Sequence, residues 1–216
     1  MGGYAVEIAI TARKGDSERV AFFVGDSMRF GGKTVCCIAS GPSLEASDCE
    51  TIEKAGIPAI AVNSSWRMAR FAEIVYAGDA CWWTAYGAEI DIPAERWSCT
   101  RQAAQRFGVN HHPAHGEYNS GMRAIQFAIW QGASRILLLG YDCSLANGSH
   151  WHGDHERTKN PDAKKVAGWH RQFAQVAAEA RATGVEVLNC SRETALICFP
   201  RLSLEEALCS FARCRD

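Results

Sequence analysis

The feature that most restricts the fold of this 216-residue chain is an alternation between short apolar runs and helix-like segments. Runs without polar alternation are typical of strands buried on both faces of a sheet. Strands are expected at 34–39, 58–63, 73–77, 136–139 and 185–189, with a weaker one at 96–100. Helices are expected at 44–55, 64–72, 120–132, 162–183 and 203–212. This order predicts an α/β domain with a mostly parallel sheet and helices on both faces.

The chain divides into two unequal parts. Residues 4–30 alternate loosely between apolar and polar positions around the turn Lys14-Gly15-Asp16, which predicts a small β extension over residues 1–32. Gly31 and Gly32 then interrupt the pattern, and the main domain is expected over residues 33–216.

Composition excludes several classes of protein. The chain has 23 basic and 24 acidic residues and a net charge of −1, which gives no support to nucleic-acid binding through bulk charge. No apolar run is long enough for a membrane span, so no membrane partner is expected. The start of the chain does not resemble a secretory signal. The ten cysteines include no C-x-x-C pair, and we therefore expect reduced thiols and a cytoplasmic protein.

Small and polar residues follow the predicted strands. Ser40-Gly41-Pro42-Ser43 follows the first strand, Asn63 the second and Asp79 the third, and Asn119-Ser120-Gly121 opens the helix at 120–132. In a parallel sheet such strand ends meet at one edge, where ligands bind. The alternative is that each residue has only a local structural role, because Asn, Asp and Ser cap helices and Gly-Pro forms turns.

The second polar cluster is Ser149-His150-Trp151-His152-Gly153-Asp154-His155. It contains the spacing H-x-H-x-D-H, with which metallo-β-lactamase-type hydrolases bind zinc. Too little chain follows His155 for the second half of such a hydrolase. We therefore interpret His150, His152, Asp154 and His155 as a catalytic loop, since imidazole transfers protons near neutral pH. The alternative is a surface loop, and the metal content is left open.

With these residues in order, the chain resembles a group of nucleotide-using enzymes, and is most similar to phage and prophage members of unknown function. The group includes family 42 sialyltransferases, motility-associated flagellin glycosyltransferases and MptE-like 6-hydroxymethylpterin diphosphokinases. The resemblance covers residues 33–210 and rests on Gly41-Pro42-Ser43-Leu44, Asn63, Asp79, Ser120-Gly121 and Leu139-Gly140-Tyr141-Asp142. It implies a Rossmann-like, sialyltransferase-type fold. Strand-end position and resemblance together predict one nucleotide site: Ser40, Gly41, Pro42, Ser43, Asn63, Asp79, Asn119, Ser120, Gly121 and Asp142.

Three functions follow as hypotheses. The first is a glycosyltransferase-like transferase with a CMP- or UDP-sugar donor, in which the histidine loop supplies acid–base catalysis. The second is an MptE-like transfer of diphosphate from Mg-ATP to a small heterocyclic alcohol, with a divalent ion held by aspartates. The third is a non-catalytic nucleotide-binding module. A small-molecule nucleotide is the expected partner in each, and the acceptor and a homo-oligomeric state are left open.

Overall fold

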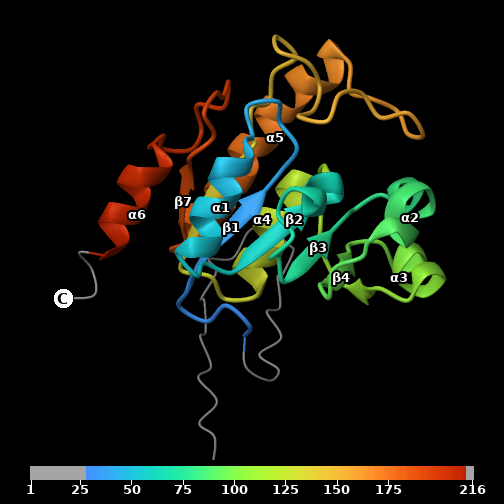
Figure 1. The fold of residues 1–216 in the computed structure, drawn as a ribbon, viewed down its shortest axis with the longest axis horizontal. Coiled ribbons are helices and arrows are strands. Elements are labelled where there is room, and N and C mark those ends of the chain that lie inside the picture. Colours follow the sequence, from blue (N-terminus) through green and yellow to red (C-terminus); the bar gives the residue numbers. More distant parts are fainter. Residues whose placement is uncertain (1–27, 213–216) are drawn as a thin grey trace, which may run out of the picture.

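The computed structural model describes residues 28–212, which form a seven-stranded sheet flanked by helices (Figure 1). The strands are β1 (Thr34–Ile38), β2 (Ala59–Val62), β3 (Ile74–Tyr76), β4 (Glu95–Ser98), β5 (Asn110–His111), β6 (Arg135–Leu139) and β7 (Glu186–Asn189). The α-helices are α1 (Ala46–Lys54), α2 (Ala80–Tyr86), α3 (Arg101–Phe107), α4 (Ser120–Trp130), α5 (Ala163–Ala182) and α6 (Leu204–Ala212). Two short 3-10 helices are η1 (Asn63–Arg67) and η2 (Gly87–Glu89).

The sheet is parallel throughout and has the order β5-β4-β3-β2-β1-β6-β7. The chain runs outward from β1 to β5 and then crosses back through α4 to place β6 on the other side of β1. The loops after β1 and β6 therefore leave the sheet in opposite directions. Such a switch point opens a crevice at the carboxyl ends of the strands. The fold is thus the α/β, Rossmann-like fold that the alternating sequence predicts.

Two hydrophobic cores cover the two faces of the sheet. In β1, Cys36 and Ile38 belong to one core, while Val35 and Cys37 belong to the other, as the period of two along a strand requires. The first core includes residues of α1, α2 and α6, and the second includes residues of α4 and α5. Burial on both faces explains why β1 and β6 are apolar without alternation.

The structure differs from the sequence-based expectation in three places. Of the β extension expected over residues 1–32, residues 1–27 lie outside the described part and residues 28–32 form turns without a strand. The helix expected at 64–72 is only the 3-10 helix η1. Between β3 and α4, the sequence did not predict α2, α3 or the two-residue strand β5. In the described part, no helix is long and apolar enough to cross a bilayer.

Candidate functional site

A cleft of about 1160 Å³ opens at the switch point between β1 and β6. Its walls come from the loops after β1, β2, β3 and β6, from the start of α4, and from residues 143–173. Most residues predicted for the site line this cleft: Ser40, Gly41, Pro42, Asn63, Asp79, Asn119, Ser120, Gly121, Asp142, His150 and His155. Ser43, His152 and Asp154 are not among the lining residues.

The loop after β1 is fixed by Asp142, which follows β6. The backbone N–H of Ser43 donates to Asp142 Oδ2 at 2.8 Å, and the Ser43 hydroxyl donates to Oδ1 at 2.7 Å. Burial raises the pKa of the Asp142 carboxyl despite these two hydrogen bonds. Asp142 therefore lines the cleft but uses its carboxylate to hold the loop, instead of offering both oxygens to a ligand.

Gly41 is required where these two loops touch. A Cβ atom at this position would lie 2.2 Å from Asp142 Oδ1 and 2.6 Å from the Gly140 carbonyl oxygen. The Gly41 N–H donates to that same carbonyl at 2.8 Å. The N–H groups of Gly41 and Ser43 are thus used inside the protein, and Pro42 has none. Neither of these N–H groups is therefore available to a ligand.

Unlike the β1 loop, the start of α4 has backbone N–H groups that are free to bind a ligand. Asn119 caps this helix, because its Oδ1 accepts from the Met122 N–H at 2.9 Å. The Ser120 hydroxyl accepts from the Gly78 N–H at 3.0 Å and so joins α4 to the end of β3. Among the hydrogen bonds of the described residues, the N–H groups of Ser120 and Gly121 have no acceptor. A helix N-terminus with free N–H groups favours a negatively charged ligand.

Asn63 and Asp79 lie on the cleft without a structural partner. Asn63 has a left-handed backbone with φ of 51°, and its buried Oδ1 has no hydrogen-bond donor. Asp79 is the N-cap residue of α2, yet its side chain makes no capping hydrogen bond and is exposed. Capping therefore explains Asn119 but neither Asn63 nor Asp79. Both are free to meet ligand atoms.

Basic side chains cover one side of the cleft. Arg157, Lys159, Lys164 and Lys165 line it, and the three lysines are exposed and form no ion pair with the described residues. Arg157, Lys164 and Lys165 are not among the residues predicted from the sequence, and their closeness to the histidine motif was the available signal.

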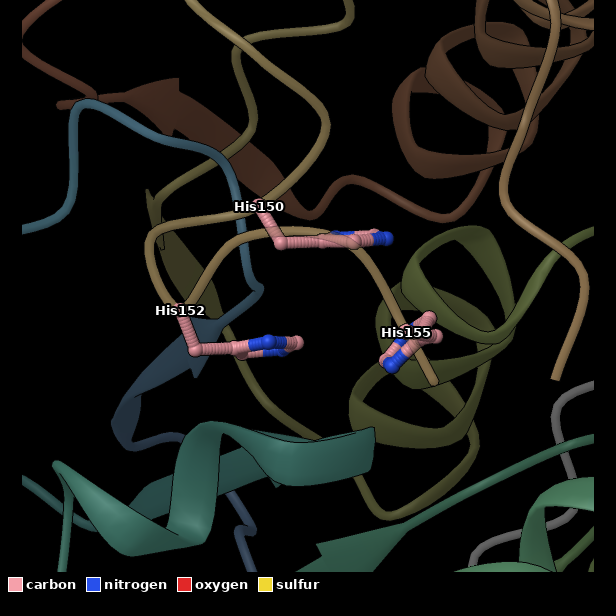
Figure 2. Close-up of side chains that lie close together, drawn as sticks. All are labelled: His150, His152 and His155. Atoms are coloured by element: carbon pink, nitrogen blue, oxygen red, sulfur yellow. The ribbon is translucent and has the colours of Figure 1, made fainter. Parts of the chain in front are cut away.

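The histidine loop folds against the β1 loop (Figure 2). His150 Nδ1 lies 2.8 Å from the Ser40 hydroxyl oxygen, and the Trp151 N–H donates to the Ser40 carbonyl at 2.9 Å. The rings of His150 and His152 are stacked, with centroids 5.2 Å apart, and His155 lies 4.4 Å from His150. Asp154 is exposed and lies outside this cluster. The pattern H-x-H-x-D-H thus brings together its histidines but not its aspartate.

The three imidazoles are neutral at neutral pH. Burial, followed by the neighbouring histidines, lowers the pKa of His150 to about 4. Burial and His152 lower the pKa of His155 to about 4, and burial and Arg67 lower the pKa of His152. Each ring therefore keeps one nitrogen lone pair available as an acceptor.

Comparison with family models, with curated proteins and with solved structures finds no match to this chain. Its function must therefore be argued from the cleft itself.

Proposed function

We propose that this protein is a transferase that binds a nucleotide in the cleft, with a nucleotide sugar as its donor. The observation that carries the proposal is the pairing of Asn63 with the start of α4. Asn63 presents an unpaired, buried acceptor, while Ser120 and Gly121 present unpaired donors to the same cleft. A nucleotide has the matching groups, because its base and ribose carry N–H and O–H donors and its phosphates carry negative charge.

The charge distribution supports an extended anionic ligand. Phosphates at the start of α4 would be favoured by the helix dipole and by the lysines of the 159–165 segment, which line the same cleft. The cleft volume of about 1160 Å³ exceeds the roughly 300–1,000 Å³ of ordinary small-molecule and cofactor sites, so it has room for a nucleotide and a second substrate. The loop after β1 would form a wall of the site with its backbone, shaped by Gly41 and Asp142.

The histidine loop adjoins this proposed donor site. His150 and His155 line the cleft, so an acceptor hydroxyl bound there would lie within reach of an imidazole. A neutral imidazole can take the proton of such a hydroxyl as a general base. This arrangement supports transfer to a hydroxyl acceptor, as in the glycosyltransferases that the sequence resembles.

One observation favours a second candidate, transfer of diphosphate from Mg-ATP to a small heterocyclic alcohol. The carboxylate of Asp79 is exposed on the cleft and caps no helix, so it is available to a magnesium ion. Phosphoryl transfer needs such an ion together with basic groups on the phosphates. The two candidates differ in nucleotide: CMP or UDP for the first, and Mg-ATP for the second.

The test is a binding screen of the purified protein against CMP, UDP, GDP, ADP and ATP, with and without Mg²⁺. A ligand that binds only the folded state stabilises it by about 2.7 kcal/mol at a hundredfold excess over its Kd. Stabilisation by CMP or UDP would support the sugar-transfer proposal, and stabilisation by Mg-ATP alone would support the second candidate. Binding of any nucleotide without turnover of candidate acceptors would indicate a non-catalytic module. Absence of binding to all five would contradict a nucleotide site.

The variant Asn63→Gly locates the bound nucleotide. Glycine accepts the left-handed backbone of this position, so the substitution removes the acceptor without adding strain. Loss of one hydrogen bond should weaken nucleotide affinity by about 3- to 10-fold. The control is Asn147→Gly, an exposed asparagine outside the cleft, which should leave the affinity unchanged. Equal affinities in wild type and Asn63→Gly would place the nucleotide elsewhere.

A further inference from the structure

The three histidines of the loop lie close enough together to be ligands of one metal ion. One nitrogen from each of His150, His152 and His155 lies within 4.8 Å of the other two. Zinc bonds imidazole nitrogen at about 2.0–2.1 Å, so its ligand atoms stand roughly 3.4 Å apart in a tetrahedral site. Small side-chain rotations would bring the three nitrogens to that spacing. Figure 2 shows the three rings facing a common space.

Two of these nitrogens are unsatisfied in the protein. The Nε2 atoms of His150 and His152 are buried and have no hydrogen-bond partner. A buried polar atom left unpaired destabilises the folded state, and two such atoms in one cluster need an explanation. A metal ion bound by both nitrogens would remove this cost. We propose that His150, His152 and His155 bind a divalent transition-metal ion of the zinc class.

The surroundings orient the imidazoles as a metal site requires. The Ser40 hydroxyl engages His150 Nδ1, so the Nε2 atom of the same ring is the one left to bind an ion. Asn160 brackets the backbone of His155, accepting from its N–H at 2.7 Å and donating to its carbonyl at 3.1 Å. The hydrogen bond to His150 Nδ1 is of the kind that fixes ligand orientation around bound metals, whereas those of Asn160 hold the backbone of His155 in place.

The chemistry of the donors selects the kind of ion. Neutral imidazole suits zinc, copper, nickel and cobalt, whereas magnesium and calcium prefer oxygen ligands. Arg67 is a positive charge near the cluster, and it pairs with Glu89, a carboxylate that it shares with Arg157.

Three protein ligands leave one tetrahedral position for water, as in catalytic zinc sites. His150 and His155 line the cleft, so that position would open toward it. In the metal-free protein the imidazoles keep the general-base role proposed above, whereas a bound ion would supply a Lewis acid and an activated water at the same place. Metal binding does not rest on the proposed nucleotide site, since the two ligand sets share no residue.

The test titrates Zn²⁺ and Co²⁺ into the full chain after removal of metal with a chelator. We expect one ion per chain, with micromolar or tighter affinity by calorimetry, no competition from Mg²⁺, and the visible absorption of tetrahedral Co²⁺ with nitrogen ligands. The variants His152→Gln and His155→Gln should each weaken binding at least a hundredfold. Ser40→Ala, which removes only the orienting hydroxyl, should weaken it about 10- to 100-fold.

The matched control is His115→Gln, a histidine outside the cluster that lies 3.5 Å from Glu179. It should bind zinc as the wild type does. Circular dichroism of each variant shows whether the fold is intact. Retention of the ion by both loop variants, sulfur-to-cobalt charge-transfer absorption from thiolate ligands, or no binding at micromolar metal would each overturn the proposal. Nucleotide binding measured on the same metal-free protein separates failure of this site from failure of the nucleotide site.

Discussion

His112 is buried in the core and does not line the cleft. Its side chain is 3% exposed, its Nδ1 lies 2.8 Å from the Tyr76 hydroxyl oxygen, and its ring packs against Phe127 and Trp130. Burial, with a contribution from Arg123, lowers the pKa of His112 to about 3. The folded protein therefore keeps this imidazole neutral at pH values where an unfolded chain protonates it.

This burial makes stability depend on pH. Below about pH 6.5 the unfolded chain gains a proton that folded His112 does not accept until about pH 3. The free energy of unfolding should therefore fall as the pH drops through this window, by a few kcal/mol in all. In His112→Gln, the decrease between about pH 7.5 and about pH 5 in urea denaturation should be smaller than in the wild type. Equal pH dependence in wild type and His112→Gln would contradict the prediction.

At the scale of elements, the long connection from β6 to α5 borders the cleft with few contacts. The Arg157 guanidinium forms an ion pair with Glu89 and lies 4.2 Å from the centroid of the Tyr86 ring. The backbone N–H of Arg157 also donates to the Tyr86 hydroxyl at 3.2 Å. This connection contains no helix or strand across residues 140–162. Its first part is held by Asp142 with Ser43 and by Asn147 with Glu193. Residues 150–162 are held by the Arg157 contacts and by those of Ser40 with the histidine loop.

The variant Arg157→Ala should loosen this connection without unfolding the domain. An exposed ion pair and an exposed cation–π contact each contribute little to the stability of the fold, because solvent screens them. We expect faster amide hydrogen exchange over residues 150–160, with little change in the midpoint of urea denaturation. Arg70→Ala is the control, because Arg70 pairs with Asp91 and lies near Trp66, away from this connection. Unchanged exchange in Arg157→Ala would show that the contact does not hold the segment.

The elements that the sequence predicts well are those whose burial is regular. The apolar runs of β1 and β6 and the long α5 lie within two residues of the predicted ranges. Between β3 and α4 the sequence predicts β4, but α2, α3 and β5 were missed because α2 and α3 each have only seven residues and β5 has two. Such short elements carry too few positions to show a period, so tertiary packing decides their structure.

The candidate site was predictable in location but not in detail. The strand-end rule correctly brings Asn63, Asp79 and Gly121 to one cleft. The sequence could not predict that Asp142 would face Ser43, because the two residues are 99 positions apart. It also gave no basis for separating Asn119, which caps α4, from Asn63, which has a free acceptor. These distinctions depend on hydrogen bonds that exist only after the sheet has formed.

At the scale of the whole molecule, the two cores share the central strands. In β1, β2 and β6, alternate residues face opposite cores, so neither face can lose its packing while the sheet remains intact. Tryptophans are present on both sides: Trp66, Trp82 and Trp83 in one core, and Trp97, Trp130 and Trp169 against the other. Tryptophan fluorescence therefore reports on both faces together.

This arrangement predicts one cooperative unfolding transition with additive changes from the two faces. Ile52 on α1 and Ile125 on α4 are fully buried in opposite cores. Ile→Val at each position should cost about 0.5–1.5 kcal/mol, and the double variant should lose the sum, because the sites share no core neighbours. Urea denaturation followed by fluorescence and by far-UV circular dichroism should give coincident curves in all three variants. Ile197→Val, at a side chain that is 97% exposed, should leave stability unchanged. Separate transitions for the two probes would show a populated intermediate and would contradict the single transition that the shared central strands predict.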